Sequence, residues 1–341
     1  MFLKVRILTQ NSLIREEENW TDYLATAISD PKVLIEKLGL PLDLFEQDFA
    51  ARQLFALRVP LPFVARMEKG NPNDPLFLQA MTSQLEFVQA EGFSPDPLEE
   101  QQTAAPNILH KYHNRLLFMV KNSCAINCRY CFRRHFPYAE NKGSKENWQQ
   151  ALAYISQHSE IEEVIFSGGD PLMAKDHELE WLIKRLENIP HLQRLRIHSR
   201  LPVVIPQRIT EKLCALLAQS RFQVVLVTHI NHPNEIDDAL ATAMAKLKAA
   251  GVTLLNQAVL LKNINDNALT LKALSEKLFA IGILPYYLHL FDKVEGASHF
   301  YLDDESAVKI YKELQSITSG YLVPKLAREI AHEPNKTLYS S

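Results

Sequence analysis

The segment KNSCAINCRYCFRRHF, residues 121–136, places Cys124, Cys128 and Cys131 within eight positions at the spacing C-x3-C-x2-C. Thiolates are soft ligands, and three of them on one loop suit zinc or an iron–sulfur cluster. A structural zinc ion normally takes four protein ligands, but the sequence contains no second C-x2-C pair. A four-iron cluster held by three thiolates leaves one iron open to a small molecule. We therefore expect an iron–sulfur cluster at this segment.

The fourth cysteine, Cys214, lies in the segment ITEKLCALLAQ, residues 209–219. A helical repeat places it beside Leu213 and Leu217, so we expect a buried, inert thiol there rather than a further ligand. Four cysteines in 341 residues are too few for a disulfide framework. The three clustered cysteines are therefore expected to bind metal.

Around the cysteine segment, apolar runs that predict strands alternate with amphipathic stretches that predict helices. The expected strands are 116–121, 163–167, 194–199, 223–228, 253–259 and 284–289. The expected helices are 145–158, 176–188, 210–219, 234–249, 267–281 and 303–319. Six βα units in order indicate an α/β fold with a parallel sheet, either an open doubly wound sheet or a partial barrel.

Segments with candidate catalytic or ligand-binding residues follow most of these predicted strands. The cysteines follow the first strand, SGGDP the second, SRLP the third, HINH the fourth and FDK the sixth. In parallel α/β folds, ligands bind at the carboxyl ends of the strands. We therefore expect these loops to converge on one pocket.

The first hundred or so residues have a different sequence pattern. Short helical patterns at 20–28, 31–37 and 54–69 alternate with the breakers GNPNDP and GFSPDP. We predict a helical N-terminal region that ends in a linker over residues 1–105.

The charge of the chain gives little reason to expect a nucleic-acid or membrane partner. The net formal charge is −3, with −7 on residues 1–105 and +4 on the rest. Such a balance does not attract polyanions. The first residues lack the pattern of a signal peptide, and no apolar run approaches the roughly 18 residues of a membrane span. We expect a cytoplasmic protein without nucleic-acid or membrane partners.

The cysteine spacing, with Tyr130 before the last cysteine, resembles the signature of the radical S-adenosylmethionine superfamily. The resemblance implies a [4Fe–4S] cluster whose open iron binds S-adenosylmethionine. One electron from an external reductant then cleaves the sulfonium to methionine and a 5′-deoxyadenosyl radical. It also implies that residues 106–320 form a partial (β/α)6 radical-SAM barrel behind the helical N-terminal region.

The loop SGGDP, residues 167–171, resembles the superfamily's glycine-rich segment that contacts the cosubstrate's amino group. The alternative is a tight βα turn in which Asp170 caps the next helix. The residues that we expect to contact the cosubstrate are Gly168, Gly169, Asp170, Ser199, Arg200 and His229. His229 and His232 could also bind metal, but hydrogen bonding is the commoner role for such a loop pair.

Several further segments are similar to the lysine 2,3-aminomutases, from about residue 110 to the end of the chain. They are CRYCFRRHF, FSGGDPL, SRLPVVIPQRIT, HINHPNEI, LLNQAVLL, PYYLH, GASHF and SGYLVP. FALRVP, RMEKGNP, DPLEEQ and KLAREIAHEPNKT resemble the shorter bacterial branch, whose product modifies translation elongation factor P.

That family uses pyridoxal phosphate as a second cofactor. Lys336, in EPNKTLY, stands at the position of the lysine that binds it covalently, within a C-terminal segment of residues 321–341. Without the resemblance, its position alone would favour interpreting Lys336 as a solvated lysine on a tail. The resemblance implies that the cofactor is held by Lys111, Tyr112 and Arg115, with Lys111 where relatives carry arginine. Gln257, at the end of the fifth predicted strand, is a further candidate for binding the cofactor.

The substrate of the family is L-lysine, which needs a cation for its carboxylate and an anion for its distant amine. Arg133 matches the family's carboxylate-binding arginine, and Asp292 matches one of two acids that bind the amine. Glu329 stands where the family has the second acid, an aspartate. Without the resemblance, both acids could equally be surface charges.

The resemblance thus implies an isomerase that moves the amino group of L-lysine from C2 to C3. The product, (R)-β-lysine, would be attached to elongation factor P by a companion ligase. Two alternatives remain open at this point. One is an aminomutase for another amino acid, although acids at Asp292 and Glu329 would repel an anionic side chain. The other is an iron–sulfur sensor without catalysis.

Overall fold

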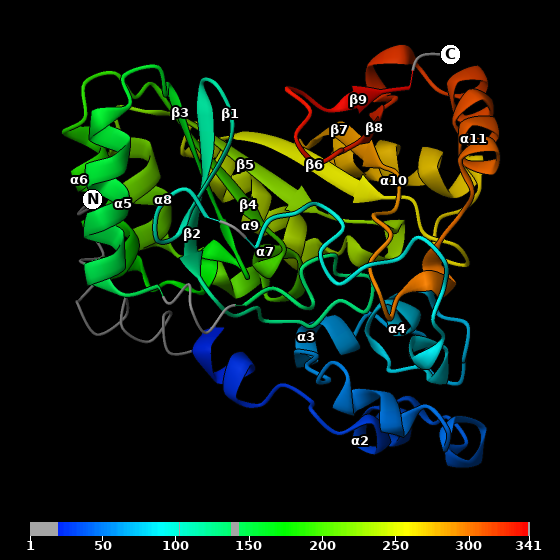
Figure 1. The fold of residues 1–341 in the computed structure, drawn as a ribbon. Helices are drawn as coiled ribbons and strands as arrows, with labels where there is room; N and C mark the ends of the chain where they lie inside the picture. The colour runs from blue at the N-terminus through cyan, green and yellow to red at the C-terminus, as the bar shows by residue number, and fades with distance from the viewer. Residues whose placement is uncertain (1–19, 102, 138–142, 340–341) are drawn as a thin grey trace, which may run out of the picture.

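The computed structural model describes residues 20–101, 103–137 and 143–339 (Figure 1). These residues contain one nine-stranded sheet in which each strand lies beside its neighbours in sequence. The strands are β1 (Ile108–Tyr112), β2 (Arg115–Lys121), β3 (Glu163–Gly168), β4 (Arg194–Ser199), β5 (Gln223–His229), β6 (Thr253–Val259), β7 (Leu284–His289), β8 (Lys325–Arg328) and β9 (Thr337–Leu338). Strands β2 to β8 are parallel, and β1 and β9 pair antiparallel at the two ends.

The strand order decides between the two predicted architectures. In a doubly wound sheet the order reverses at a switch point, whereas here it runs from β1 to β9 without reversal, as in a barrel. Among the described strands β1 and β9 are not paired with each other, so the barrel is partial. The predicted partial barrel is therefore confirmed. Strand β8 adds a seventh parallel strand that the sequence did not predict.

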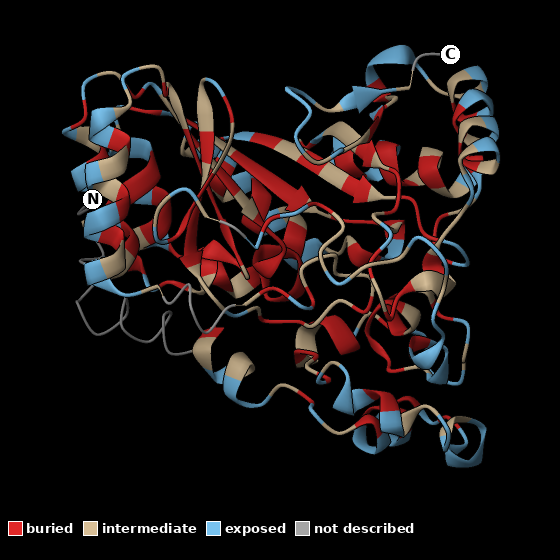
Figure 2. Ribbon diagram, viewed as in Figure 1, coloured by how far each residue is buried: buried red, intermediate tan, exposed pale blue. Residues whose placement is uncertain are grey.

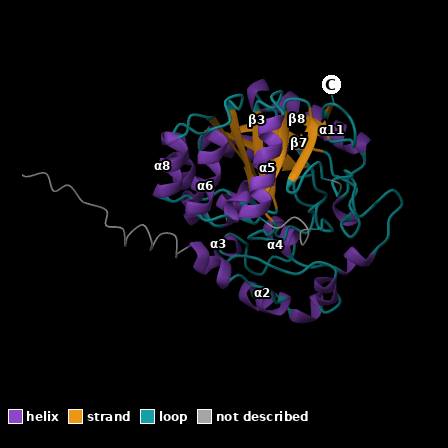
Figure 3. Ribbon diagram, turned by 60° about the vertical axis from the view of Figure 1, so that its left-hand side comes forward, coloured by secondary structure: helices purple, strands orange, loops and turns teal. Residues whose placement is uncertain are grey.

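Six helices follow the predicted positions and surround the sheet on its outer side (Figure 3). They are α5 (Lys145–Gln157), α6 (Asp176–Glu187), α8 (Glu211–Gln219), α9 (Asp238–Ala249), α10 (Ala268–Ala280) and α11 (Asp304–Ile317). Five begin after a polar residue whose side chain accepts a hydrogen bond from the first turn, for example Asp237 from the backbone N–H of Leu240 at 2.8 Å. No helix within the described ranges has the length and apolarity to cross a bilayer.

The start of α9 differs from the prediction. A helix was expected from residue 234, but the chain forms a separate 3-10 turn at Pro233–Glu235 and begins α9 only at Asp238. Asp237 causes this delay, because its side chain caps the helix at the later position.

The N-terminal region contains α2 (Pro31–Leu38), α3 (Leu61–Val64), α4 (Pro75–Ala80) and short 3-10 turns, which lie together below the sheet in Figure 1. The helical pattern predicted over 54–69 yields only α3, because prolines at 60 and 62 restrict the chain around it. The predicted breaker GNPNDP instead starts α4. Its Asp74 accepts hydrogen bonds from the backbone N–H groups of Leu76 and Phe77, at 2.9 and 2.8 Å.

The N-terminal region shares a core with the barrel. One apolar cluster joins Trp20, Phe63 and Phe77 to side chains of the strands, and the parallel strands are largely buried (Figure 2). The predicted division of the chain at residues 105 and 320 stays a prediction.

A buried cluster of ion pairs connects the N-terminal region to the loop that contains the cysteines. Glu86 binds Arg129 through two hydrogen bonds and Arg134 at 2.7 Å, and all three side chains are fully buried. Removing one partner of such a buried group typically costs about 3–5 kcal/mol, because a charge is left without a counter-ion. Both arginines lie within three residues of Cys131, so Glu86 holds the loop that carries the cysteines.

Candidate active site

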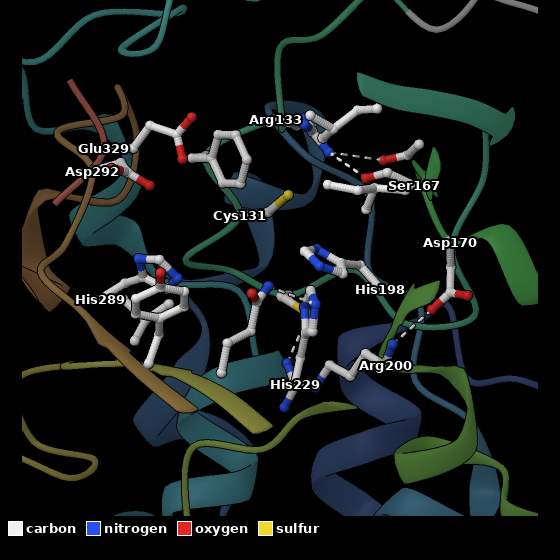
Figure 4. A pocket seen from close by; sticks show the side chains of 18 of the residues that line it. Cys131, Arg133, Ser167, Asp170, His198, Arg200, His229, His289, Asp292 and Glu329 are labelled. Atoms are coloured by element: carbon white, nitrogen blue, oxygen red, sulfur yellow. Dashed lines mark hydrogen bonds between the residues drawn. The ribbon is translucent and has the colours of Figure 1, made fainter. Parts of the chain in front are cut away.

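The carboxyl ends of the parallel strands surround a cavity of about 480 Å³ (Figure 4). This size suits a small-molecule site. The predicted site residues that line it are Tyr112, Arg115, Cys124, Cys128, Cys131, Arg133, Gly168, Gly169, Asp170, Arg200, His229, Gln257, Asp292, Glu329 and Lys336. Ser199 and Lys111 lie behind this lining, where Ser199 contacts Asp170 and Lys111 contacts Glu329. Their individual roles stay predictions.

The three cysteines lie on the loop after β2, and the backbone N–H of Cys131 donates to the carbonyl of Cys128 at 3.0 Å. Within the described ranges, no three His, Cys, Asp or Glu side chains surround one point, as a single zinc ion would require. In an iron–sulfur cluster each thiolate binds a different iron, so no common point is needed. Three soft thiolates on one loop of the cavity wall are a donor set that suits an iron–sulfur cluster.

Arg200 lies against this loop. One terminal nitrogen donates to the sulfur of Cys128 at 2.7 Å, and the other donates to Gln79 at 2.9 Å and Glu235 at 3.0 Å. Arg200 is 5% exposed. Its fixed guanidinium places a positive charge beside a sulfur that must be a thiolate to bind iron.

The glycines of SGGDP have a packing role that the sequence did not reveal. A Cβ atom on Gly168 would lie 2.2 Å from the carbonyl oxygen of Lys121, and one on Gly169 would lie within 2.7 Å of the backbone of Ser123. Gly168 also has a φ of 127°, a conformation that side chains disfavour. The two glycines therefore let β3 end directly against the chain that leads into Cys124.

Asp170 links the ends of β3 and β4. Its carboxylate accepts hydrogen bonds from the backbone N–H groups of Leu172, Arg200 and Leu201 at 2.8–3.0 Å, and from the hydroxyl of Ser199 at 2.7 Å. The capping role considered for Asp170 is thus present, because Leu172 belongs to the short 3-10 helix that follows. These bonds place Arg200 beside the cysteines (Figure 4).

Three histidines line the cavity without carrying charge at neutral pH. Burial lowers the pKa of His229 and His289 to about 3, and it holds the pKa of His198 well below its usual value. The side-chain amide of Gln257 lies 2.8 Å from Nε2 of His229, so the neutral ring accepts a hydrogen bond there. These three histidines therefore give the cavity polar groups that add no charge.

Opposite Asp170 and Arg200 in Figure 4 lie Asp292 and Glu329. Glu329 accepts hydrogen bonds from Lys336 and from the hydroxyl of Tyr112, the latter at 2.9 Å, and lies 3.5 Å from Lys111. Burial alone would raise the pKa of Glu329, but the two lysines outweigh it and hold that pKa at about 2. Glu329 is therefore a charged acid directly beside Lys336.

Arg133 lies on the same side as the cysteines and faces both β3 and the linker. Its Nη1 donates to the hydroxyl of Ser167 at 3.1 Å and to the carbonyl of Gly168 at 3.5 Å. Its Nε donates to Glu100 at 2.5 Å. Arg133 is thus fixed between the end of β3 and a buried acid.

Known proteins resemble the chain over almost its whole length. Residues 119–271 match the Radical SAM superfamily. The L-lysine 2,3-aminomutase of Haemophilus influenzae is 72% identical over 337 residues, which cover 98% of this chain and 100% of that protein. The enzyme of the same name from Escherichia coli is 60% identical over 334 residues, 97% of this chain and 96% of that protein. The chain belongs to the L-lysine 2,3-aminomutase family.

Membership in this family makes the chain a radical SAM enzyme of the isomerase class, as the resemblance implied. It also implies a [4Fe–4S] cluster and S-adenosylmethionine, and the three cysteines of the cavity suit that cluster. Among solved structures, a radical SAM methyltransferase from Sphaerobacter thermophilus covers 65% of this chain and 68% of its own, with 16% identity and a TM-score of 0.45.

In this aminomutase-family chain, the cavity residues that the sequence reasoning missed include His198, His289 and Glu100. His198 and His289 each lie at or near the end of a predicted strand, the position that also marks His229. That pattern could have found them. Glu100 lies in the linker, and nothing in the local sequence separates it from the exposed Glu99 beside it. Only the folded chain shows that Glu100 is buried against Arg133.

Proposed function

We propose that this chain moves the amino group of L-lysine from C2 to C3, using pyridoxal phosphate together with the cluster and S-adenosylmethionine. The observation that carries the proposal is that Lys336 opens into the same cavity as the three cysteines. A covalently bound cofactor at Lys336 and a radical made at the cysteines would therefore meet in one enclosed space. Family membership supports the same reaction.

The charges in the cavity suit a substrate with a carboxylate and a distant amine. Arg133 provides a cation near the cysteines, and Asp292 and Glu329 provide acids near Lys336. A glutamate side chain would meet two acids of like charge, which disfavours an aminomutase for an acidic amino acid. The exchange of Asp for Glu at 329 keeps the charge that the amine needs.

The residues around Lys336 suit pyridoxal phosphate. The amine of Lys336 lies 5.8 Å from the ring centre of Tyr287, and Arg115 stacks over the ring of Tyr112 at 4.0 Å. Arg115 and Lys111 supply the positive charge that a phosphate requires. Lys111 offers a point charge rather than the planar fork of arginine, so it binds phosphate with less geometric constraint.

When bound, the cofactors supply a radical that takes hydrogen from C3 and a π system that stabilises the migrating nitrogen. The chain's own residues bind and orient the reactants. Arg133 binds the carboxylate, and Asp292 and Glu329 hold the distant amine. The neutral histidines limit the charge of the cavity, and its walls bring the residues that bind the reactants into one space.

We also propose that the product serves elongation factor P through a companion ligase, and that an external one-electron reductant charges the cluster. Similarity to the shorter bacterial branch supports this role. Transfer of the chain's product to elongation factor P by the ligase, detected as an increase in protein mass, tests it. Product that the ligase rejects would contradict this part of the proposal.

The reaction is tested with reduced, cluster-loaded protein, S-adenosylmethionine and pyridoxal phosphate. With L-lysine we expect (R)-β-lysine, and with L-glutamate we expect unchanged substrate. Chiral chromatography separates the two lysine isomers. Unchanged L-lysine from protein that holds both cofactors would overturn the proposed reaction on the free amino acid.

Substrate binding should depend on pH through Asp292. Burial raises the pKa of Asp292 to about 7; Glu329 and Glu100 act in the same direction, and Lys336 and Arg328 oppose it. Below that pH the side chain is neutral and attracts the substrate amine weakly. Above it the carboxylate is charged, while the substrate amine keeps its proton up to about pH 10.

We therefore expect affinity for L-lysine to rise with pH, by up to about tenfold per unit below pH 7, and to level off above it. Equilibrium binding between about pH 6 and pH 8 measures this dependence. Asp292→Asn should bind weakly throughout and lose most of the slope. An unchanged slope in that variant would assign the pH dependence to another group.

A further inference from the structure

Glu100 is the acid that reaches the cavity from the linker. Its side chain is 4% exposed, whereas that of its neighbour Glu99 is 63% exposed. Hydrogen bonds fix the backbone of the linker turn at this residue. The Asp96 carboxylate accepts them from the backbone N–H groups of Glu100 and Gln101, at 2.9 and 3.0 Å. Glu100 therefore lines the cavity from a turn with a fixed shape.

Both oxygens of Glu100 bind cations of the proposed active site. One accepts from Nε of Arg133 at 2.5 Å, and the other lies 2.8 Å from the amine of Lys111. Lys111 in turn contacts Glu329, which binds Lys336. Five side chains of alternating charge thus run from Arg133 to Lys336, and Glu100 joins the first cation to the second.

We propose that Glu100 is a positioning residue for substrate binding, which holds Arg133 in the orientation that receives the substrate's α-carboxylate. This inference rests on the proposed function, because it assigns the carboxylate to Arg133. The guanidinium is planar, so a contact at Nε together with the contacts of Nη1 to Ser167 and Gly168 determines its plane. A side chain oriented beforehand loses less conformational entropy when the ligand binds.

Glu100 supports the substrate carboxylate rather than competing with it. Each of its oxygens already has a cation. Burial alone would raise the pKa of Glu100, but Arg133 and Lys111 outweigh it and lower that pKa. A substrate that displaced Glu100 would leave a buried carboxylate without a partner, which is strongly unfavourable. Glu100 therefore stays in place when the substrate arrives, and its loss should weaken binding.

The test compares three variants of the protein loaded with cluster and pyridoxal phosphate, without S-adenosylmethionine so that no turnover occurs. Glu100→Gln removes the charge, Glu100→Asp withdraws it by one methylene, and Glu99→Gln is the matched control on the neighbouring exposed acid. Equilibrium dialysis gives the Kd for labelled L-lysine. Competition gives the Kd for 1,5-diaminopentane, which has both amines but no carboxylate.

We expect the Kd for L-lysine to rise about tenfold in Glu100→Gln and about threefold in Glu100→Asp, and to stay unchanged in Glu99→Gln. The Kd for 1,5-diaminopentane should change less than about twofold in all three. In turnover the Gln variant should raise KM more than it lowers kcat. If Glu100→Gln fails to fold, the Kd values of Glu100→Asp for L-lysine and 1,5-diaminopentane provide the same test.

Unchanged or tighter L-lysine binding in the Glu100 variants would overturn the inference while leaving the proposed function intact. An equal loss of affinity for both ligands would also overturn it, because the damage would then not act through the carboxylate. Failure of the wild-type protein to bind L-lysine would overturn the proposed function itself, and the inference with it.

Discussion

Replacing Lys336 by alanine should abolish covalent binding of pyridoxal phosphate and reduce turnover of L-lysine by at least about a thousandfold. Lys336 is a lysine of the C-terminal segment that lines the cavity, and the charged Glu329 lies directly beside it. Alanine removes the only atom of this side chain that can form the covalent link. Visible absorbance of the bound cofactor and product formation measure the two effects.

Lys325→Ala is the control for this substitution. Lys325 belongs to the same end of the chain but is exposed on β8, so the variant should keep the cofactor absorbance and its activity. The assignment of Lys336 would be wrong if its alanine variant still bound the cofactor covalently. A variant that lost iron as well would point to misfolding instead.

Replacing Cys131 by alanine should remove the iron–sulfur cluster and with it all formation of 5′-deoxyadenosine. Three thiolates are the fewest that hold such a cluster while leaving one iron open, so losing one leaves two iron sites unprotected. Iron content after anaerobic reconstitution should fall from about four atoms per chain to near zero. S-adenosylmethionine should then remain intact in the presence of a reductant.

Cys214→Ala distinguishes this effect from a general loss of thiols. Cys214 is buried on α8, and burial raises the pKa of its thiol to about 11, so it is a protonated core residue. Its variant should keep the cluster and lose only about 1 kcal/mol of stability from the small cavity. A cluster that survives in Cys131→Ala but not in Cys214→Ala would reverse the assignment of the ligands.

The barrel was largely predictable because its strands are long and apolar and its helices begin at polar caps. Strands β2 to β7 and the six major helices lie where periodicity places them. Strand β8 has four residues and β9 has two, which is too short for a periodic signal. In the N-terminal region the helix predicted at 31–37 is present as α2, but the pattern over 54–69 is interrupted by prolines 60 and 62, and α4 begins at Pro75 inside a predicted breaker.

The candidate site was predictable where a side chain follows a strand or belongs to a recognisable motif. Cys131 and Asp292 are of that kind, and both line the cavity. Contacts between distant segments have no such signal. The burial of Glu100 against Arg133 and the close packing of Gly168 on Lys121 depend on segments that meet only in the folded chain.

Among the described strands, β1 and β9 end the sheet without pairing with each other, so the barrel wall has a seam there. Tyr112 and Lys111 on β1 reach Glu329 at the end of β8, so side chains rather than a ladder of backbone hydrogen bonds bridge the gap in the barrel wall. Such contacts can be exchanged one at a time with water or with an incoming phosphate. The barrel wall can therefore loosen along this seam without breaking the backbone pairing of any strand.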